Sequence, residues 1–378
     1  MLNSLYLHWP FCPYKCHFCP FVAIASHDQF MPDYQKALKK EILDFAKNFN
    51  KESSIKSVFL GGGTPSTCPN NLLLDTFDIL NSVFSFEKNA EISIEVNPGT
   101  VKPGQLEVWK LAGINRLSIG IQSLNDDVLK KLNRHQTSAD VFALIENASK
   151  IFENISVDLI IGLPGVTEQE WKDLILKIGS WPIKHLSIYF LTVHEDTPLY
   201  FGVKKNKIIL PPDNQIIELY YWSINKLKEF GFNQYEISNF AKQGYESTHN
   251  SAYWKRLPYK GFGLGACSFD GQSRFQNEKN LMTYMNNLNE GRETTIFAEK
   301  LEIHQIWLEK LMLGIRQIKG VEINELIQNL NEEKKIKFLN KINDLQKQNL
   351  ISFDGDVLKL SHQGLALENQ IVLELAIN

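Results

Sequence analysis

The chain has 378 residues, of which 43% are hydrophobic and 22% charged, and its formal net charge is −3. This composition is that of a globular protein with two or three domains, and the near-neutral charge argues against a broadly basic nucleic-acid-binding protein. No apolar run is long enough to span a membrane and the N-terminus does not resemble a signal peptide, so we expect a cytoplasmic protein without a membrane span.

The first half of the chain predicts an α/β fold. Short β-rich runs occur at residues 4–8, 55–60, 91–95, 115–120, 156–161 and 185–191, and helical apolar spacing occurs between them at residues 34–49, 71–84, 105–111 and 168–178. This alternation predicts parallel strands with helices on the outer face, either as an open sheet or as a barrel-like closure. In both arrangements, the segments that follow the strands meet at one edge, where binding sites form.

The pattern changes after about residue 200. Residues 204–214 are polar and then proline-rich, which predicts a boundary, and a helix is expected at 214–230, followed by an irregular segment to about 275. From residue 301 onward, three helices and a hairpin over 351–360 are predicted, an order that resembles a winged helix. Residues 301–350 carry eight Lys and Arg against seven Asp and Glu, which favours a structural or lid role over DNA binding.

These features divide the chain into three parts. We expect a barrel-like domain at residues 1–212, a connecting region at 213–298 and a smaller, mainly helical C-terminal domain at 299–378.

Three of the five cysteines lie within eight residues, directly after the first predicted strand: Cys12, Cys16 and Cys19. An odd number of cysteines with this clustering indicates metal or redox chemistry rather than a disulfide framework. Zinc would need a fourth ligand, and His17 lies inside the loop in a cramped position. Three thiolates on an iron–sulfur cubane would instead leave one iron open to a small molecule.

The segment CPYKCHFC, residues 12–19, resembles the Cys-x-x-x-Cys-x-x-Cys loop of radical S-adenosylmethionine (SAM) proteins. The resemblance implies a [4Fe-4S] cluster on the three cysteines, with SAM as the ligand of the open iron. In that superfamily, the reduced cluster cleaves SAM to a 5′-deoxyadenosyl radical, while the protein positions the cofactor and substrate.

Residues 61–65, GGGTP, end the second predicted strand, and their glycines allow a close approach of the backbone to a ligand. Alone, this segment would be read as a tight turn. Beside the cysteine loop it resembles the glycine-rich segment that holds the SAM amino group, which implies roles for Gly62, Gly63 and Thr64. Glu95 ends the third strand, where its carboxylate could accept hydrogen bonds from the same amino group.

Further positions match SAM contacts of one subfamily. Gln122, Arg134 and Asp158 are among them, and Arg suits a carboxylate while Asp suits ribose hydroxyls. The resemblance also implies that Tyr6 and Phe18 belong to the SAM pocket.

The motifs LHWPFC, GGGTP, EVNPGT, GIQSLN, LNRHQ and DLIIGLPG together resemble the HemN-like group of radical SAM proteins. This group contains oxygen-independent coproporphyrinogen III dehydrogenases and HemW-type heme chaperones. The resemblance covers nearly the whole chain and implies a partial (βα)6 TIM-like barrel followed by a smaller, winged-helix-like C-terminal domain.

Two features distinguish the branches of the group. The dehydrogenases carry a further cysteine two residues after the third ligand, where this chain has Phe21. HemW-type proteins carry His-Asn-x-x-Tyr-Trp, which stands here as HNSAYW from His249 to Trp254. An imidazole can ligate heme iron and aromatic rings can pack on a porphyrin, although an isolated His-Asn pair more often belongs to a core. HemW-type loops usually have an acid where this chain has Pro20.

The resemblance favours a heme chaperone that uses the cluster, SAM and a reductant, contacts heme through His249 and transfers it to an unidentified acceptor protein. Whether SAM is turned over stays open. The alternative is an oxygen-independent coproporphyrinogen III dehydrogenase, against which Phe21 argues. A third possibility is an iron–sulfur protein with a degenerate SAM site, against which the retained SAM motifs argue. Cys68 and Cys267 have no assigned role and are expected to be packed thiols.

Overall fold

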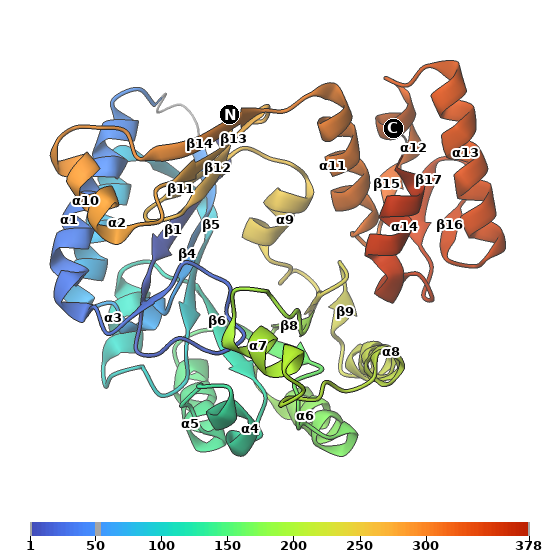
Figure 1. Ribbon diagram of the computed structural model, residues 1–378. Coiled ribbons are helices and arrows are strands. Elements are labelled where there is room, and N and C mark those ends of the chain that lie inside the picture. Colours follow the sequence, from blue (N-terminus) through green and yellow to red (C-terminus); the bar gives the residue numbers. More distant parts are fainter. Residues whose placement is uncertain (1, 50–53, 377–378) are drawn as a thin grey trace.

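A single twelve-stranded sheet forms the centre of the molecule in the computed structural model, which describes residues 2–49 and 54–376 (Figure 1). Its middle consists of six adjacent parallel strands in chain order: β1 (Ser4–Trp9), β4 (Ser54–Gly62), β5 (Ser85–Val96), β6 (Arg116–Gln122), β7 (Asn154–Ile161) and β8 (His185–Phe190). These are the six strands that the sequence predicts, and the α/β fold class is confirmed.

Helices follow these strands along the chain and cover the outer face of the sheet (Figure 1). They are α1 (Met31–Ala46), α2 (Asn70–Val83), α3 (Gln105–Leu111), α5 (Ser138–Ser149), α6 (Glu168–Ser180) and α8 (Asp213–Glu229). Two short helices, α4 (Asp126–Lys131) and α7 (Pro198–Lys204), lie at the edge where the parallel strands end. Capping boxes at Thr137 and Thr167 fix the starts of α5 and α6. In the middle of these parallel strands, β6 is buried at every residue except Gln122.

The sheet extends beyond the six strands at both edges. Beside β1 lies the parallel strand β11 (Tyr259–Phe262), followed by the antiparallel strands β12 (Cys267–Phe269), β13 (Ser273–Asn277) and β14 (Thr295–Lys300). At the other edge, β10 (Asn239–Ala241) and β9 (Asn233–Gln234) follow β8. Two helices, α9 (Thr248–Trp254) and α10 (Leu281–Asn289), belong to the same part of the chain.

The expectation of an irregular segment up to about residue 275 was therefore wrong. The strands in this region have only two to five residues, which is too short to show a clear alternation of apolar and polar side chains. They also take their place in the sheet by pairing with the remote strands β1 and β8, which local sequence does not reveal.

The C-terminal part confirms the predicted order of three helices and a hairpin. Its helices are α11 (Ile303–Ile315), α12 (Ile323–Ile327) and α13 (Glu332–Lys347), and its hairpin is β16 (Ile351–Phe353) with β17 (Val357–Leu360). A short strand, β15 (Val321–Glu322), pairs with β17, and α14 (Glu368–Leu375) closes the described chain. Three 3₁₀ turns complete the elements, at Asp28–Phe30, Pro65–Thr67 and Leu365–Leu367.

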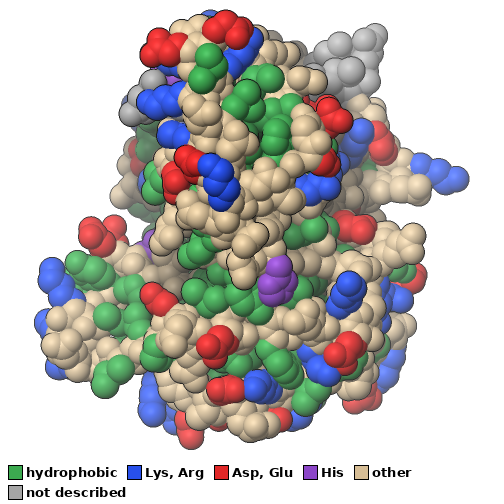
Figure 2. Space-filling model, turned by 90° about the vertical axis from the view of Figure 1, so that its right-hand side faces the viewer, with side chains coloured by type: hydrophobic (Ala, Val, Ile, Leu, Met, Phe, Trp, Pro, Cys, Tyr) green, Lys and Arg blue, Asp and Glu red, His purple; other side chains and the backbone are tan. Residues whose placement is uncertain are grey.

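This C-terminal unit has its own hydrophobic core, in which Leu311, Phe338 and Ile342 are fully buried. An ion pair joins it to the sheet domain: Arg316 Nε lies 2.6 Å from Glu236 Oε2, and Glu236 is fully buried. Figure 1 shows the unit at one side of the sheet, with α11 beside α9. Figure 2 views the molecule from this side and shows basic, acidic and apolar side chains interspersed on the visible face. Within the described residues, no helix combines the length and hydrophobicity needed to cross a bilayer.

Candidate functional site

The cysteine loop begins at β2 (Phe11–Cys12) and ends at β3 (Ile24–Ala25), two short strands that pair in parallel. Two backbone hydrogen bonds fix its middle. The His17 N–H donates to the Leu132 carbonyl at 2.9 Å, and the Leu199 N–H donates to the His17 carbonyl at 3.0 Å. The loop is therefore held between the end of α4 and the start of α7, at the edge where the parallel strands end.

The three cysteines line one cavity of about 410 Å³ at this edge. Cys12 is 7% and Cys16 8% exposed, and Cys19 is partly exposed. Burial raises the pKa of the Cys12 thiol to about 11 and also raises that of Cys19. Iron binding would displace these thiol protons, so the cluster and the protons compete for the same sulfur atoms.

The three cysteines supply the thiol groups that a cubane cluster takes from a protein. Among the described residues, no three His, Cys, Asp or Glu side chains converge on a point that a single metal ion could occupy. A cubane takes each thiolate on a different iron atom, so its ligands stand around a cavity instead of meeting at one point. With three protein thiolates, a bound cluster would have one iron without a protein ligand.

The glycine-rich segment at the end of β4 forms one wall. Gly62 has φ of 115°, which L side chains rarely adopt, and its N–H donates to Glu95 Oε2 at 3.1 Å. A Cβ atom on Gly63 would lie 2.6 Å from the Pro10 carbonyl oxygen, too close for any side chain. Thr64 is buried, and its hydroxyl oxygen lies 3.2 Å from the Cys12 sulfur. The GGGTP segment thus forms part of the cavity wall and also contacts the cysteine loop.

Two partly buried carboxyl groups line the cavity, Glu95 near the end of β5 and Asp158 on β7. Burial and then the charge of Asp158 raise the pKa of Glu95 to about 8, and burial raises the pKa of Asp158. The Ser118 and Ser187 hydroxyls donate to Asp158 at 2.9 and 2.7 Å. A ligand with an amino group and hydroxyl groups would supply the partners that such carboxylates need when ionised.

A bulge and a buried arginine complete the cavity. Gln122 has φ of 67° where the pairing of β6 with β7 shifts register. Arg134 donates to Asn97 Oδ1 at 3.0 Å and to the Gly120 carbonyl, and its Nη1 lies 3.7 Å from the Cys16 sulfur. These contacts hold the guanidinium rigidly at the cavity wall, where it can pair with a carboxylate.

The structure brings together nearly all the residues that the sequence assigns to SAM. Those that line the cavity with the cysteines are Phe18, Gly62, Gly63, Thr64, Glu95, Gln122, Arg134 and Asp158. The exception is Tyr6, which lines an adjoining inner chamber of about 170 Å³. The chamber and the cavity share part of their lining, including Glu95 and Asp158.

Sequence reasoning missed other lining residues. Asn97, Tyr189, Leu191 and His194 line the same cavity, at or after the ends of β5 and β8. These segments lie at the ends of parallel strands, where binding sites form, so their location was predictable from the sequence. No motif singled out the individual residues.

His249 lines the inner chamber and not the cysteine cavity. Its side chain is 1% exposed, and both ring nitrogens have partners: Nδ1 lies 2.9 Å from the Ser57 hydroxyl and Nε2 lies 2.9 Å from the Tyr253 hydroxyl. The ring also stacks on Phe59, with centroids 5.1 Å apart. Burial lowers the pKa of His249 to about 3, so the imidazole is neutral.

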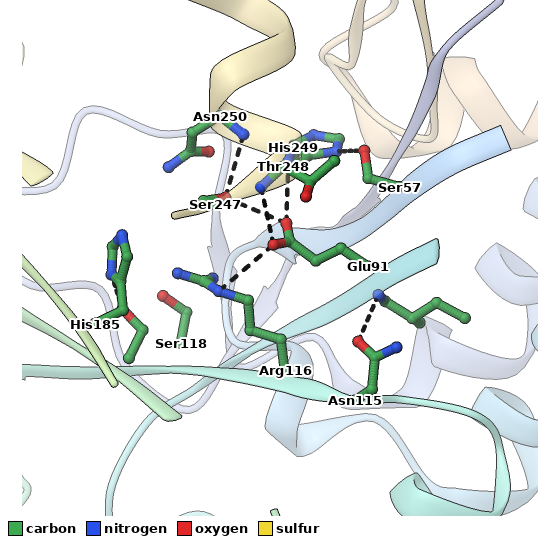
Figure 3. A network of polar contacts seen from close by, with 12 residues as sticks. Ser57, Glu91, Asn115, Arg116, Ser118, His185, Ser247, Thr248, His249 and Asn250 are labelled. Carbon is green, nitrogen blue, oxygen red and sulfur yellow. Dashed lines mark hydrogen bonds and ion pairs between the residues drawn. The ribbon is translucent and has the colours of Figure 1, made fainter. Parts of the chain in front are cut away.

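A polar network fastens α9, which carries His249, to the sheet (Figure 3). The Thr248 and His249 N–H groups donate to the Glu91 carboxylate at 2.9 and 3.0 Å, and the Ser247 hydroxyl donates to it at 3.2 Å. Arg116 Nε lies 3.8 Å from the same carboxylate. The start of α9 is thereby tied to β5 and β6.

Comparisons with known proteins agree with this site. Residues 6–178 match the model of the radical SAM superfamily. The chain is 34% identical over 376 residues to the heme chaperone HemW of Bacillus subtilis, and the match covers 98% of each chain. The chain belongs to the HemW family of radical SAM proteins. The mitochondrial radical S-adenosyl methionine domain-containing protein 1 of Danio rerio is 31% identical to the chain, in a match that covers 98% of this chain and 86% of its own.

Among solved structures, coproporphyrinogen III oxidase (HemN) of Escherichia coli superposes with a TM-score of 0.86. The match covers 99% of this chain and 90% of HemN at 24% identity, so it shows the shared fold. The predicted radical SAM barrel with a smaller C-terminal domain is thus confirmed for this member of the HemW family. Membership of the superfamily implies a [4Fe-4S] cluster and SAM, and the cavity has the residues to hold both.

Proposed function

We propose that the protein is a heme chaperone that carries a [4Fe-4S] cluster and SAM, binds heme and transfers it to an acceptor protein in the cytoplasm or at a membrane. The observation that carries the proposal is the single cavity in which the three thiols meet Gly62, Glu95 and Arg134, in a chain similar over its whole length to HemW.

Each group has a defined part in this proposal. Cys12, Cys16 and Cys19 would hold the cluster, which supplies an electron to bound SAM when reduced. Glu95 would accept hydrogen bonds from the SAM amino group, Asp158 from ribose hydroxyls, and Arg134 would pair with the SAM carboxylate.

The alternative is decarboxylation of coproporphyrinogen III. The loop residue that would be a cysteine in such an enzyme is Phe21, whose side chain is 64% exposed at the cavity rim. An apolar ring there can neither donate a proton nor bind iron. The fold shared with HemN is compatible with both functions, and Phe21 favours the chaperone.

The assignment of heme contact to His249 stays a prediction. Because Ser57 and Tyr253 occupy both ring nitrogens, iron ligation by His249 would require one of these bonds to break and α9 to move away from the sheet. A heme site at His249 would therefore form only after local opening.

The proposal is tested with protein that has been reconstituted with iron and sulfide under anaerobic conditions. In the presence of SAM, a strong reductant and coproporphyrinogen III, we expect no vinyl-bearing product, whereas hemin added to the protein should pass to an apo-hemoprotein acceptor. Substrate-dependent formation of 5′-deoxyadenosine and vinyl product would establish the dehydrogenase instead. Each of the changes Cys12→Ala, Cys16→Ala and Cys19→Ala should abolish the cluster absorbance. Cys267 is exposed, so the expectation of a packed thiol was wrong for this residue, and Cys267→Ala is a control that should retain the absorbance.

A further inference from the structure

The inner chamber contains a buried cation that makes no hydrogen bond to the described residues. Arg116, the first residue of β6, is 1% exposed and lines the chamber. Its Nε has no hydrogen-bond partner, and the carboxylate of Glu91 lies 3.8 Å away, which is too long for a hydrogen bond. A guanidinium carries a full charge and five donor N–H groups, so it is costly to bury without partners.

The neighbours of Arg116 on one side are already engaged. Glu91 accepts hydrogen bonds from one hydroxyl and two backbone N–H groups at the start of α9. Figure 3 shows the guanidinium pointing away from these bonds, toward Ser118 and His185. Both ring nitrogens of His185 are in turn bonded, to the Ser156 and Tyr235 hydroxyls. The guanidinium therefore has free donors on its chamber side.

Two further carboxyl groups line the chamber, Glu95 and Asp158. Within the described chain, neither lies within 4 Å of a nitrogen of Arg116. Asp158 accepts from two serine hydroxyls, and burial raises the pKa of Glu95 to about 8, so that Glu95 is mostly protonated at neutral pH. The proposed function assigns both groups to SAM. Arg116 is then the charge that is left for a second molecule.

Neutral donors stand at the same chamber. Tyr189 on β8 and Asn250 on α9 both line it. Burial raises the pKa of Tyr189, so its hydroxyl keeps its proton and can donate. The side-chain amide of Asn250 makes no hydrogen bond to the described residues, since only its backbone N–H is bonded. A guanidinium with a hydroxyl and an amide suits a carboxylate, whose two oxygens accept from the guanidinium side by side.

The size and position of the chamber restrict the ligand. Its volume of about 170 Å³ is below the range of about 300–1,000 Å³ that is typical of sites for drug-sized ligands, and it excludes a tetrapyrrole. One unpaired cation matches one negative charge. The chamber shares four lining residues with the cysteine cavity, which are Glu95, Ser118, Asp158 and Tyr189. A ligand here would lie next to SAM.

We propose that the inner chamber binds a small monocarboxylate on Arg116, beside SAM, with Tyr189 and Asn250 as further donors. The inference rests on the proposed function in one respect, the assignment of Glu95 and Asp158 to SAM. It adds a second small ligand to the barrel and does not concern the binding of heme.

The test is a titration of the full-length protein, reconstituted with its cluster and supplied with SAM, with acetate as the probe. Saturation-transfer NMR at constant ionic strength follows the binding. Acetamide, which has nearly the same shape and no charge, should bind more than ~10-fold more weakly. Arg116→Gln should weaken acetate binding more than ~10-fold, because charge-assisted hydrogen bonds are lost. Tyr189→Phe should weaken it roughly 2- to 10-fold.

Matched variants control for indirect effects. Arg292→Gln removes an exposed arginine that pairs with Glu290 at 2.8 Å outside the chamber, and it should bind acetate like the wild type. Arg116→Lys keeps the charge and should restore part of the affinity that Arg116→Gln loses. Tyr189→Phe removes a single oxygen atom and should leave the circular dichroism unchanged. It therefore tests the site even if the loss of the buried charge at Arg116 unfolds the chain.

The outcomes separate this inference from the proposed function. Acetate that binds no better than acetamide, or unchanged binding in any folded Arg116→Gln or Tyr189→Phe protein, would overturn the carboxylate site and leave the chaperone function standing. Displacement of acetate by SAM would place the carboxylate of SAM itself on Arg116 and overturn a separate ligand. Loss of hemin transfer from protein that still binds acetate would overturn the proposed function alone.

Discussion

Replacement of His249 by alanine should destabilise the sheet domain, whatever its effect on heme. The change removes two hydrogen bonds of the ring and its stacking on Phe59, and it leaves a cavity in a site that is 1% exposed. A hydrogen bond contributes about 1 kcal/mol and truncation of a buried ring costs about 3–5 kcal/mol. We therefore expect a loss of about 3–5 kcal/mol in the free energy of unfolding.

The pH dependence gives a second, independent signature. The pKa of His249 is about 3 in the folded chain and 6.5 ordinarily, so as the pH falls through 6.5 the unfolded chain gains a proton that the folded chain does not. The stabilising contribution of the neutral ring is therefore complete above pH 6.5 and is lost progressively down to about pH 3. At ~1.4 kcal/mol for each pH unit, this loss has an upper limit of about 5 kcal/mol.

Urea unfolding of the cluster-free protein, followed by circular dichroism from pH 7.5 to pH 4, measures both effects. His249→Ala should lower the denaturant midpoint at pH 7.5, and its midpoint should fall less steeply with acid than that of the wild type. His8, whose pKa burial lowers to about 4, leaves a residual slope in both proteins. His304→Ala, an exposed control, should change neither. An unchanged midpoint and slope in His249→Ala would refute the structural role of the His249 ring in the sheet domain.

Three further changes test other parts of the structure. Glu95→Gln should weaken SAM binding by about tenfold to a hundredfold, because hydrogen bonds to a charged group are lost, and isothermal titration of the reconstituted protein measures it. Glu236→Gln should remove the buried partner of Arg316 and lower the free energy of unfolding by about 3–5 kcal/mol. If this pair anchors the C-terminal domain, amide hydrogen exchange should also increase at α11. Glu91→Gln weakens the cap of α9 without touching the imidazole; hemin binding should increase if heme needs α9 to open, and unchanged binding would argue against such opening.

Much of the sheet domain was predictable because its pattern is local. Each of the six parallel strands is apolar and is followed by a helix or a turn, and parallel strands in this arrangement neighbour one another in chain order. The strands after residue 230 lack this support. They are short, and β11 pairs with β1 across more than half of the chain, so no local pattern could place it.

The site residues that lie at strand ends were predictable from the sequence. Glu95 and Gln122 end their strands and line the cavity, as expected. Tyr6 lies three residues before the end of β1, and at a rise of about 3.3 Å per residue its ring is about 10 Å below the rim. The alternation of a strand predicts which face a side chain takes, whereas depth within a barrel depends on the stagger of all the strands.

The HNSAYW motif shows why a shared pattern does not determine a role. On a helix, His249 and Tyr253 are four residues apart and share a face, and here that face is turned into the sheet, where the two side chains bond to each other. A motif of this kind could serve either of two roles. It could be a latch that holds α9 closed over the inner chamber, or it could supply an iron ligand that is exposed when α9 opens. The two roles differ in the state of the imidazole: a latch needs both ring nitrogens engaged, and a ligand needs one free. In the structure both ring nitrogens of His249 are engaged, so His249 meets the condition for a latch and could ligate iron only after one of these bonds breaks.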